Sequence, residues 1–444
     1  MHNLYDANKC ERYKVAEMKK YKDMSKDELL TLKAALMEEY KEEQAKGLSL
    51  NMARGKPGAD QLELSMGMLD VLREGSDFKS ENGIDVRNYG ELSGIPECKK
   101  LFADILGVQP EEVIVGGSSS LTLMFDTVQR AWNFGVPGGD KPWCKYDKIK
   151  FLCPVPGYDR HFSVTETFGI ELVNVPMTKT GPDMDMVEKL VSEDETIKGI
   201  WCVPMYSNPD GITYSDETVK RFANLSPKAK DFRIFWDNAY CVHHLTDHPD
   251  KLLNLMDELK KTGKENMVYM FASTSKITFP GAGVAVMAMS KENVDATLKI
   301  LNFQAISYDK MNMLRHVRFF KNADGVRAHM EKHRKLLAPK FEAVLETLDR
   351  EVGELGILDW VKPNGGYFIS VNTMNGCAKR VVELCKNAGV VLTGAGATFP
   401  YKKDPDDKNI RLAPSFPPID ELKTAMDLFC LCVKLASAEK LLAE

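Results

Sequence analysis

The sequence predicts an α/β protein with a large domain, built on a mostly parallel seven-stranded sheet, and a smaller α+β domain. Three observations support this fold class. The chain has 444 residues, more than one ordinary hydrophobic core holds. From about residue 60 to residue 290, short apolar segments alternate with helical ones, which is typical of a parallel sheet covered by helices. After residue 290 the pattern changes to long helical stretches with a few short strands.

Seven apolar segments are the strand candidates of the large domain. They cover residues 112–117, 148–154, 170–176, 198–204, 232–237, 267–272 and 283–289. Helical stretches of suitable length lie between most of them, at 119–134, 215–228 and 250–262. Because near-continuous apolar strands separated by helices are buried on both faces, these segments predict a doubly covered, mostly parallel sheet.

The smaller domain is predicted from the C-terminal part of the chain. A helical region runs to about Arg350, and Pro339 is expected to kink or divide it. Short strands follow at 357–361, 367–371 and 391–393. A helix is expected at 377–388, and a last helix lies in the segment from residue 417.

An amphipathic helix near the N-terminus is expected to complete the smaller domain. It covers about residues 25–46 and begins with the capping-box spacing of Ser25 and Glu28. The predicted divisions are an N-terminal segment at 1–60, a large domain at 61–305 and a small domain at 306–444.

Charge and composition exclude several classes of function. The net charge is −5 and the pI is near 6.0, so neither nucleic acid nor an anionic membrane is an expected partner. No apolar run approaches the length that spans a bilayer, and the polar start of the chain does not resemble a secretory signal. The ten cysteines are scattered without a C-x-x-C pair, as in a protein with reduced thiols. We expect a cytoplasmic protein.

Residues that follow the strands are the candidates for a site, because ligands of open α/β sheets bind at the carboxyl ends of the strands. Ser118, Ser119 and Ser120 follow the strand at 112–117 and begin a helix, where free N–H groups and hydroxyls favour a phosphate. Tyr158 follows the next strand, where its ring can stack on a planar ligand. A serine-rich helix cap or a packing aromatic would have the same composition.

Three further strands also end in polar residues. Asn208 begins the turn N-P-D-G after the strand at 198–204. Asp237 ends the next strand, where a carboxylate needs a cation or a hydrogen-bond donor, and Tyr240 follows it. Ser273 and Lys276 come next, at the junction of two apolar strands. Taken alone, Asn208 is explained by the turn and Lys276 by an exposed loop.

Taken together, the five strand ends match the needs of pyridoxal 5′-phosphate (PLP). Lys276 would form the Schiff base and then move the proton between the substrate Cα and the cofactor C4′. Asp237 would keep the pyridine nitrogen protonated, so that the ring accepts electrons when the Cα–H bond breaks. Asn208 and Tyr240 would contact the ring hydroxyl, and the helix start at 118–120 would bind the phosphate.

The order of three motifs resembles fold-type I PLP-dependent aminotransferases of the aspartate aminotransferase superfamily. The motifs are N-P-x-G at 208–211, D-x-A-Y at 237–240 and S-x-S-K at 273–276, and the resemblance extends from Asn51 to the last helix. It implies a homodimeric transaminase with Lys276, Asp237 and Tyr240 as catalytic residues. It also implies that Ser273 contacts the cofactor.

Additional motifs agree with this resemblance. The segment 87–107 resembles the one in which a tyrosine, here Tyr89, reaches the phosphate of the partner subunit. The segment "NMARGKP" resembles the glycine segment over the substrate, which makes Gly55 and Asn208 substrate-binding candidates. The segment "NIRLAPSF" places Arg411 at the position that binds the substrate carboxylate, which a guanidinium does through two parallel charge-assisted bonds.

One motif departs from the family pattern. The family usually carries a phosphate-binding arginine shortly after the lysine, but "SKITFPGAG" has none, and what replaces it stays open. This shortened motif resembles a divergent subgroup of aspartate aminotransferases related to the MocR-like branch. The resemblance implies transfer from L-aspartate to 2-oxoglutarate. Four arginines are candidates for the side-chain carboxylate, namely Arg54, Arg87, Arg315 and Arg318.

Other functions remain alternatives. The same fold could serve a PLP-dependent β-lyase or an aminotransferase of different specificity. A ligand-sensing regulator is not expected, because only about 50 residues precede Asn51 and no basic recognition helix is visible. Metal binding at His243, His244 and His248 is not expected either, since the resemblance places these histidines beside the site.

Overall fold

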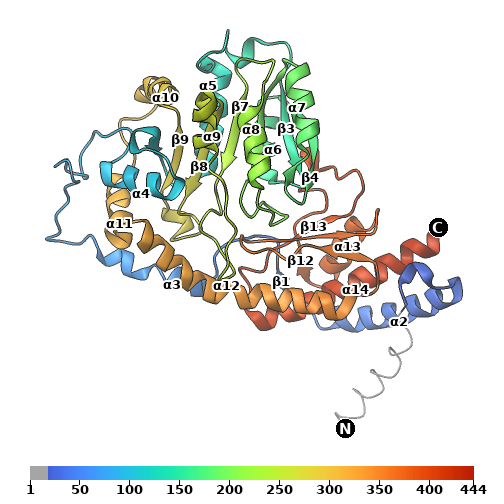
Figure 1. The fold of residues 1–444 in the computed structure, drawn as a ribbon. Coiled ribbons are helices and arrows are strands. Elements are labelled where there is room, and N and C mark those ends of the chain that lie inside the picture. The colour runs from blue at the N-terminus through green and yellow to red at the C-terminus, as the bar shows by residue number, and fades with distance from the viewer. Residues whose placement is uncertain (1–18) are drawn as a thin grey trace.

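An eight-stranded sheet with helices on both faces forms the larger part of the computed structural model, which describes residues 19–444 (Figure 1). The strand order is β2-β9-β8-β7-β6-β3-β4-β5. The strands are β2 (Val113–Val115), β3 (Lys150–Val155), β4 (Glu171–Thr178), β5 (Gly181–Pro182), β6 (Ile197–Cys202), β7 (Arg233–Asp237), β8 (Val268–Ser273) and β9 (Ala285–Met289). The start of the chain, which we expected not to be a secretory signal, lies mostly outside the described residues.

The strands β8, β7, β6, β3 and β4 are parallel, whereas β9 runs antiparallel to both of its neighbours. All seven predicted strands are present, and the mostly parallel sheet is confirmed. The predicted number of seven is wrong because β5 adds an eighth. It pairs antiparallel with the end of β4 over two residues, Gly181 and Pro182, which is too short to produce a pattern in the sequence.

The helices of the large domain cover the two faces of the sheet. Their bounds are α4 (Pro96–Leu106), α5 (Ser120–Phe134), α6 (Asp159–Thr167), α7 (Met184–Glu193), α8 (Asp216–Asn224), α9 (Leu255–Thr262) and α10 (Lys291–Gln304), and α11 (Lys310–Phe320) packs on α4. One hydrophobic core joins α4, α7, α8 and α9 to residues such as Val113 and Leu152, and another joins α5, α6 and α10 to Ile114 and Phe151. Neighbouring residues of one strand therefore enter opposite cores, as the pleat requires.

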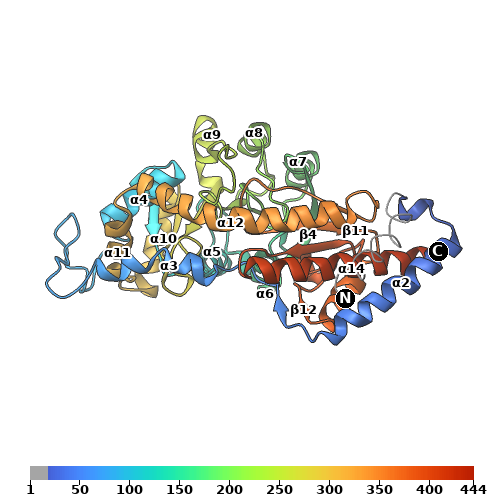
Figure 2. The same cartoon turned by 90° about the horizontal axis from the view of Figure 1, so that it is seen from below.

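The smaller domain contains a three-stranded antiparallel sheet and a short parallel pair. The sheet has the order β10-β11-β13, with β10 (Leu358–Trp360), β11 (Ile369–Thr373) and β13 (Asn409–Leu412), and the pair joins β1 (Leu50–Asn51) to β12 (Val390–Val391). The helices are α2 (Lys26–Ala45), α12 (Ala323–Val352), α13 (Ala378–Asn387) and α14 (Ile419–Ala443), and the short α3 (Ala59–Glu63) packs on α12. Figure 2 shows α12, α14 and α2 side by side beneath the sheets.

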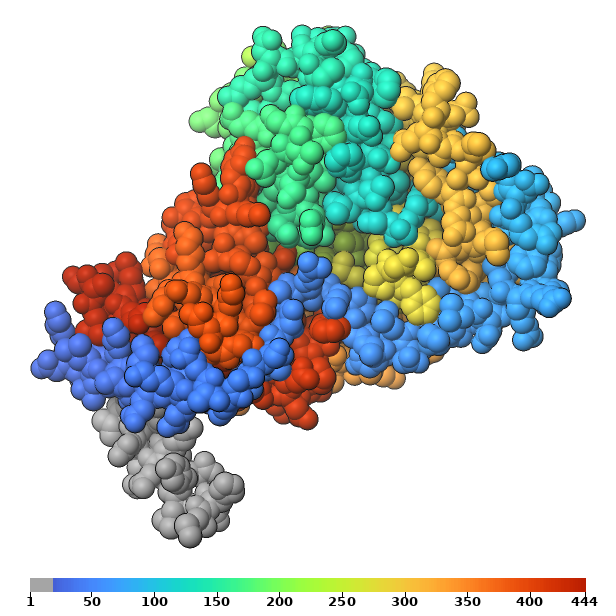
Figure 3. Space-filling model, turned by 180° about the vertical axis from the view of Figure 1, so that it is seen from behind, coloured from blue at the N-terminus to red at the C-terminus, as the bar shows by residue number. Residues whose placement is uncertain are grey.

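The N-terminal helix begins as predicted. The backbone N–H of Glu28 donates to the Ser25 hydroxyl, and the Glu28 carboxylate accepts from the Ser25 N–H, so the capping box is confirmed. The helix packs on the small domain, where the Tyr40 hydroxyl donates to Leu384 O at 2.8 Å. In the space-filling view the blue N-terminal segment continues along the base from the smaller domain to the larger (Figure 3). The boundaries at residues 60 and 305 stay predictions.

The helical region expected to run to about Arg350 is divided between α10 and α11 and again at Lys321. Pro339 was expected to kink or divide this region, and division there is wrong, because α12 continues through Pro339 as one 30-residue helix. Lys321 has a positive φ of 69°, which ends α11. The strand β13 was not predicted, although it carries Arg411.

Within the described residues, each helix is too short or too polar to span a bilayer.

Candidate active site

Lys276 lies just beyond the end of β8, where the chain leaves the sheet. Its Nζ is 5.1 Å from the ring centroid of Tyr240 and 5.9 Å from that of Tyr367. Burial lowers the pKa of Lys276 from the ordinary value, the Asp237 carboxylate opposes this, and the Arg411 cation adds to it. The site therefore favours the neutral amine, which is the nucleophilic and basic form of a lysine.

Asp237 ends β7, the neighbour of β8, and is 3% exposed. Its Oδ2 is 2.9 Å from His161 Nε2, which donates to it. Its Oδ1 is buried and has no hydrogen-bond partner among the described residues. A buried carboxylate oxygen without a donor is costly, so this atom indicates a ligand that supplies an N–H.

His161 is a site residue that the sequence analysis missed. It lies one turn into α6, three residues after Tyr158, and its ring stacks on Trp201 with centroids 4.5 Å apart. The Tyr158 ring meets it edge-on at 4.9 Å. The stack holds the imidazole in the plane that lets Nε2 reach Asp237. The spacing of Tyr158 and His161 at i and i+3 on a helix was the signal that could have shown it.

The three serines predicted to bind phosphate begin α5. Ser119 is the N-cap of this helix, yet its side chain makes no capping hydrogen bond, which leaves its hydroxyl available. Ser273 Oγ donates to Ser275 Oγ at 3.1 Å, and Ser275 Oγ donates to Ser118 O at 3.4 Å. The structure thus joins Ser273 to the segment 118–120 in one polar region at the start of a helix, which favours an anion.

The segment that lacks the family arginine packs closely against these serines. A Cβ on Gly283 would lie 3.1 Å from Ser118 O and 3.2 Å from Thr274 Oγ1. Asn312 of α11 donates through Nδ2 to the carbonyls of both Ala282 and Gly283 at 2.9 Å. Ser118, Thr274 and Asn312 therefore pack closely around the segment after Lys276.

The four candidate arginines have different surroundings. Arg315 donates to the Asn312 side chain, and its Nε is buried without a partner in the described part of the chain. Arg87 pairs with Asp85 at the surface. Arg54 is exposed, and Arg318 is half-buried. Of the four, Arg315 is the one bonded to the side chain that holds the segment after Lys276.

The tyrosines Tyr158 and Tyr240 keep their phenol protons. Burial raises the pKa of Tyr158 to about 12 and raises that of Tyr240 well above the ordinary value. Neither hydroxyl hydrogen-bonds to another residue within 19–444. Both can therefore donate to a ligand oxygen.

Arg411 lies on β13 of the small domain and is 7% exposed. Its Nη1 donates to Asp159 Oδ1 at 3.0 Å and to Asn208 Oδ1 at 3.2 Å. Its Cζ is 4.8 Å from the centre of the Phe368 ring. Gly55 packs on the other end of that ring, since a Cβ there would lie 2.5 Å from the tip of Phe368. The predicted residues Gly55, Asn208 and Arg411 are thus brought together.

Tyr89 lies apart from these residues in the single chain. It is 75% exposed, in the segment that precedes α4. Its expected role at the phosphate of a partner subunit stays a prediction.

The three histidines considered for metal binding have separate surroundings. The His243 ring is buried edge-on between Tyr240 and Tyr367, at 5.7 and 5.6 Å. His244 Nδ1 is 2.8 Å from the Tyr206 hydroxyl. No group of three or more His, Cys, Asp or Glu side chains within residues 19–444 is arranged to hold a metal ion.

A buried network behind Lys276 was also missed. His329 Nε2 and His333 Nε2 are each 3.0 Å from Ile277 O, and the Tyr367 hydroxyl donates to Lys276 O at 3.4 Å. Gln61 of α3 donates to both His333 Nδ1 and the Tyr367 hydroxyl. Three donors therefore hold two consecutive carbonyls of the segment that carries the lysine.

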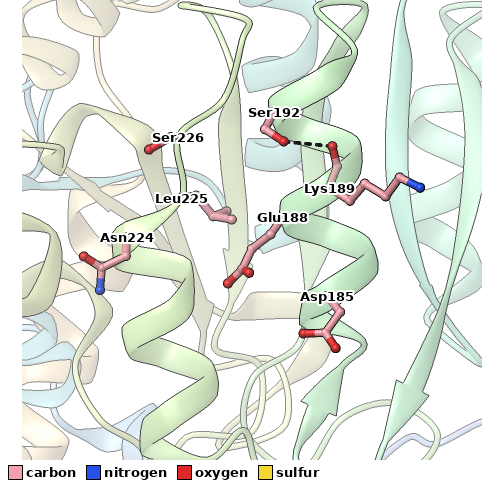
Figure 4. A pocket seen from close by; sticks show the side chains of 7 residues that line it. All are labelled: Asp185, Glu188, Lys189, Ser192, Asn224, Leu225 and Ser226. Atoms are coloured by element: carbon pink, nitrogen blue, oxygen red, sulfur yellow. Dashed lines mark hydrogen bonds between the residues drawn. The ribbon is translucent and has the colours of Figure 1, made fainter.

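A surface pocket of about 430 Å³ lies elsewhere, between α7 and α8 (Figure 4). Glu188 of α7 points toward α8, where Arg221 donates to both of its oxygens at 2.7 and 2.8 Å. The pocket also contains Ser192 and Asn224 at the C-terminal ends of the two helices. Helices in such folds run opposite to the strands, so this pocket lies at the edge away from Lys276.

The family model described as aspartate amino-transferase matches residues 24–444. The chain belongs to the aspartate aminotransferase family. An aspartate aminotransferase of Corynebacterium glutamicum is 45% identical over 428 residues, covering 96% of this chain and 99% of that protein.

Solved structures agree with membership of the aspartate aminotransferase family. The crystal structure of an aspartate transaminase from Corynebacterium glutamicum matches with a TM-score of 0.92 at 45% identity, covering 94% of this chain and 98% of that one. An α-aminoadipate aminotransferase from Thermus thermophilus, complexed with N-(5′-phosphopyridoxyl)-L-leucine, matches with a TM-score of 0.71 at 20% identity, covering 90% and 95%. At that identity the second match shows the fold alone. The narrower relation to the MocR-like branch stays a prediction.

Proposed function

We propose that this member of the aspartate aminotransferase family is a PLP-dependent transaminase that converts L-aspartate and 2-oxoglutarate to oxaloacetate and L-glutamate. The unpartnered Oδ1 of Asp237 carries the cofactor assignment, because a protonated ring nitrogen is the donor that this buried oxygen lacks. The preference for aspartate is supported by the relatives that are named aspartate aminotransferases.

The residues around Asp237 fit the remaining parts of PLP. The start of α5 with the free hydroxyl of Ser119 suits the phosphate, and Ser273 adjoins it. The protonated phenol of Tyr240 suits the ring hydroxyl. Lys276, with its lowered pKa, suits the aldehyde carbon. When bound, PLP supplies an electron sink for the pair of electrons released at the substrate Cα.

The chain's own residues would then bind, orient and transfer a proton. Arg411 would bind the α-carboxylate of the substrate, with Asn208 beside it and Gly55 packed on the Phe368 ring over which the guanidinium lies. Lys276 as a neutral amine would remove the proton from the substrate Cα and deliver it to the cofactor C4′. Asp237, held by His161, would keep its free Oδ1 directed at the ring nitrogen.

We also infer a homodimer. One end of the molecule exposes several large apolar side chains, which a monomer rarely leaves in water. They include Phe303 (92%), Ile306 (67%) and Met311 (41%) with Tyr89 (75%). Figure 1 shows α10, α11 and the segment before α4 gathered at this end. A second copy at this end would also bring its Tyr89 near a neighbouring site, as the family resemblance implies.

A cytoplasmic location is part of the same proposal. The nine cysteines within the described residues are all free thiols, and eight of them are at least partly buried. Free thiols are typical of reducing compartments.

The proposed reaction is tested by separate half-reactions. The visible spectrum of the PLP-loaded protein is recorded after adding aspartate, glutamate, alanine or cystathionine. Aspartate and glutamate should bleach the cofactor band, and 2-oxoglutarate or oxaloacetate should restore it. The Lys276→Ala variant is the control, since it should bind cofactor without the band of the wild type.

Two results would contradict the proposal. If Lys276→Ala leaves the band unchanged, the assignment of this lysine is wrong. If only cystathionine reacts, with release of pyruvate and ammonia, the protein is a β-lyase.

A further inference from the structure

The ion pair of Arg411 with Asp159 is a feature that the proposed reaction does not use. Arg411 belongs to β13 of the small domain, whereas Asp159 is the first residue of α6 in the large domain. The two side chains meet at 3.0 Å between Nη1 and Oδ1. The pair therefore spans the two domains at the place where, on the proposed function, the substrate α-carboxylate binds.

Asp159 is chemically equivalent to the group that Arg411 is proposed to bind. Its side chain ends in a carboxylate, and a guanidinium pairs with one carboxylate through two parallel bonds. The Nη1 group already donates to both Asp159 and Asn208, and the one positive charge of Arg411 is balanced by Asp159. A second carboxylate beside the first would be repelled by it.

The two members of the pair differ in how easily they can move. Arg411 has a side chain that is 8% exposed, lies over the Phe368 ring and comes from a strand paired on β11. The Asp159 side chain is 33% exposed and stands in the first turn of α6. A carboxylate in that turn is stabilised by the helix N-terminus even when it turns to water. Asp159 is thus the partner that can leave.

We propose that Asp159 is a built-in competitor of the substrate carboxylate. It occupies Arg411 in the free enzyme and is displaced when an amino acid or 2-oxo acid binds. Since the same bond must be broken for every substrate, Asp159 weakens binding of all of them and eases release of products. It does not touch the reacting atoms, so it acts on KM and leaves kcat nearly unchanged.

The test measures carboxylate binding without turnover. Succinate, a dicarboxylate that cannot react, is titrated into the PLP-loaded enzyme by calorimetry, and KM and kcat are measured for aspartate. Asp159→Asn should lower both the succinate Kd and the aspartate KM by about 5-fold, the effect of a partly exposed ion pair, with kcat within about 2-fold. Asp159→Ser, a second residue that suits a helix start, should do the same.

Glu166→Gln is the matched control. It removes one negative charge from the same helix at an exposed position, and it should leave the Kd and KM unchanged. A mere change in net charge would affect both variants alike.

The inference and the proposed function fail in different ways. If Arg411→Gln loses succinate binding but Asp159→Asn binds it as the wild type does, the competitor role is overturned while the carboxylate site stands. If Asp159→Asn binds succinate more weakly, Asp159 holds Arg411 in place instead of competing. If Arg411→Gln binds succinate as well as the wild type, the proposed carboxylate site itself is wrong and the inference falls with it.

Discussion

At the scale of single residues, Lys276 is a base in surroundings that disfavour its charge. Burial and the Arg411 cation lower its pKa, and Asp237 partly restores it. A lowered pKa means that the amine is neutral at pH values where exposed lysines still carry a proton. The same environment that makes the residue a nucleophile thus makes it distinguishable from the other lysines of the chain.

We predict that Lys276 of the cofactor-free protein reacts with trace acetic anhydride at lower pH than exposed lysines do. Peptide mass spectrometry across a pH series gives the midpoint for each lysine. Asp237→Asn should move the Lys276 midpoint further down, because it removes a stabilising anion. Arg411→Gln should move it up. Equal midpoints for Lys276 and the exposed lysines would show that the amine is not desolvated.

The pKa of Asp210 is shifted in the opposite direction from that of Lys276. Burial raises its pKa to about 6, and a hydrogen bond from Ser370 opposes this. Because the folded-state pKa exceeds that of the unfolded chain, the folded protein binds the proton more tightly, and stability falls as the pH rises from about 4 to about 6.

We therefore predict that Asp210→Asn is more stable than the wild type at pH 7.5, by on the order of 2 kcal/mol, with the difference closing toward pH 4.5. Urea unfolding of the two proteins across this range measures it. A difference that does not vary with pH would mean that Asp210 titrates normally.

At the scale of elements, the start of α5 is a helix terminus whose N-cap hydroxyl is not used by the helix. Ser119 makes no side-chain capping bond, unlike Ser290 at the start of α10, which accepts from Asn293 N at 3.2 Å. A cap residue that does not cap has its hydroxyl free for a ligand. Ser119 and Ser290 therefore offer a direct comparison between a serine proposed to bind a ligand and a serine that caps a helix.

We predict that Ser119→Ala raises the Kd for PLP by about 10-fold, the loss of one hydrogen bond to a charged group, with no change in stability of the cofactor-free protein. Ser290→Ala should do the reverse, with unchanged PLP affinity and a loss of about 1 kcal/mol of stability. Cofactor titration by absorbance and thermal unfolding measure the two effects. Equal PLP affinity in Ser119→Ala and the wild type would exclude this hydroxyl from the phosphate site.

Sequence patterns predicted those elements whose own residues decide their conformation. The seven apolar strands and the helix capped by Ser25 have such patterns, and Asp237 and Lys276 were found because each follows a strand. The two-residue β5 and the strand β13 depend on pairing with β4 and β11, which the local sequence does not encode. Pro339 was expected to kink or divide a helix, and α12 continues through it undivided.

The site residues that the sequence analysis did not find also depend on contacts with distant parts of the chain. His161 and the network around Gln61 gain their roles from contacts made across 76 and 272 residues of chain. Side chains that act through such distant partners carry no local signal. Asp159 was passed over because only the fold brings it to Arg411, 252 residues away.

At the scale of the whole molecule, one end exposes a group of large apolar side chains formed by α10, α11 and the segment before α4. We predict that Phe303→Asp, at a side chain 92% exposed, reduces the protein to monomers. Light scattering after size exclusion measures the mass. The control is Phe134→Asp, at another exposed phenylalanine (63%), which lies at the end of α5 and should leave the mass unchanged. A wild-type protein that is already monomeric would contradict the proposed homodimer.

The network behind Lys276 has a consequence for how the enzyme is made. His329 and His333 from α12 and Tyr367 beside β11 hold the backbone of the lysine segment. Gln61 of α3 donates in turn to the Tyr367 hydroxyl. During synthesis the sheet and its lysine leave the ribosome well before Tyr367 and Arg411 do. A nascent chain that ends before Tyr367 lacks the hydroxyl that donates to Lys276 O, and one that ends before Arg411 lacks the proposed carboxylate site. The complete site therefore exists only after nearly the whole chain has been translated.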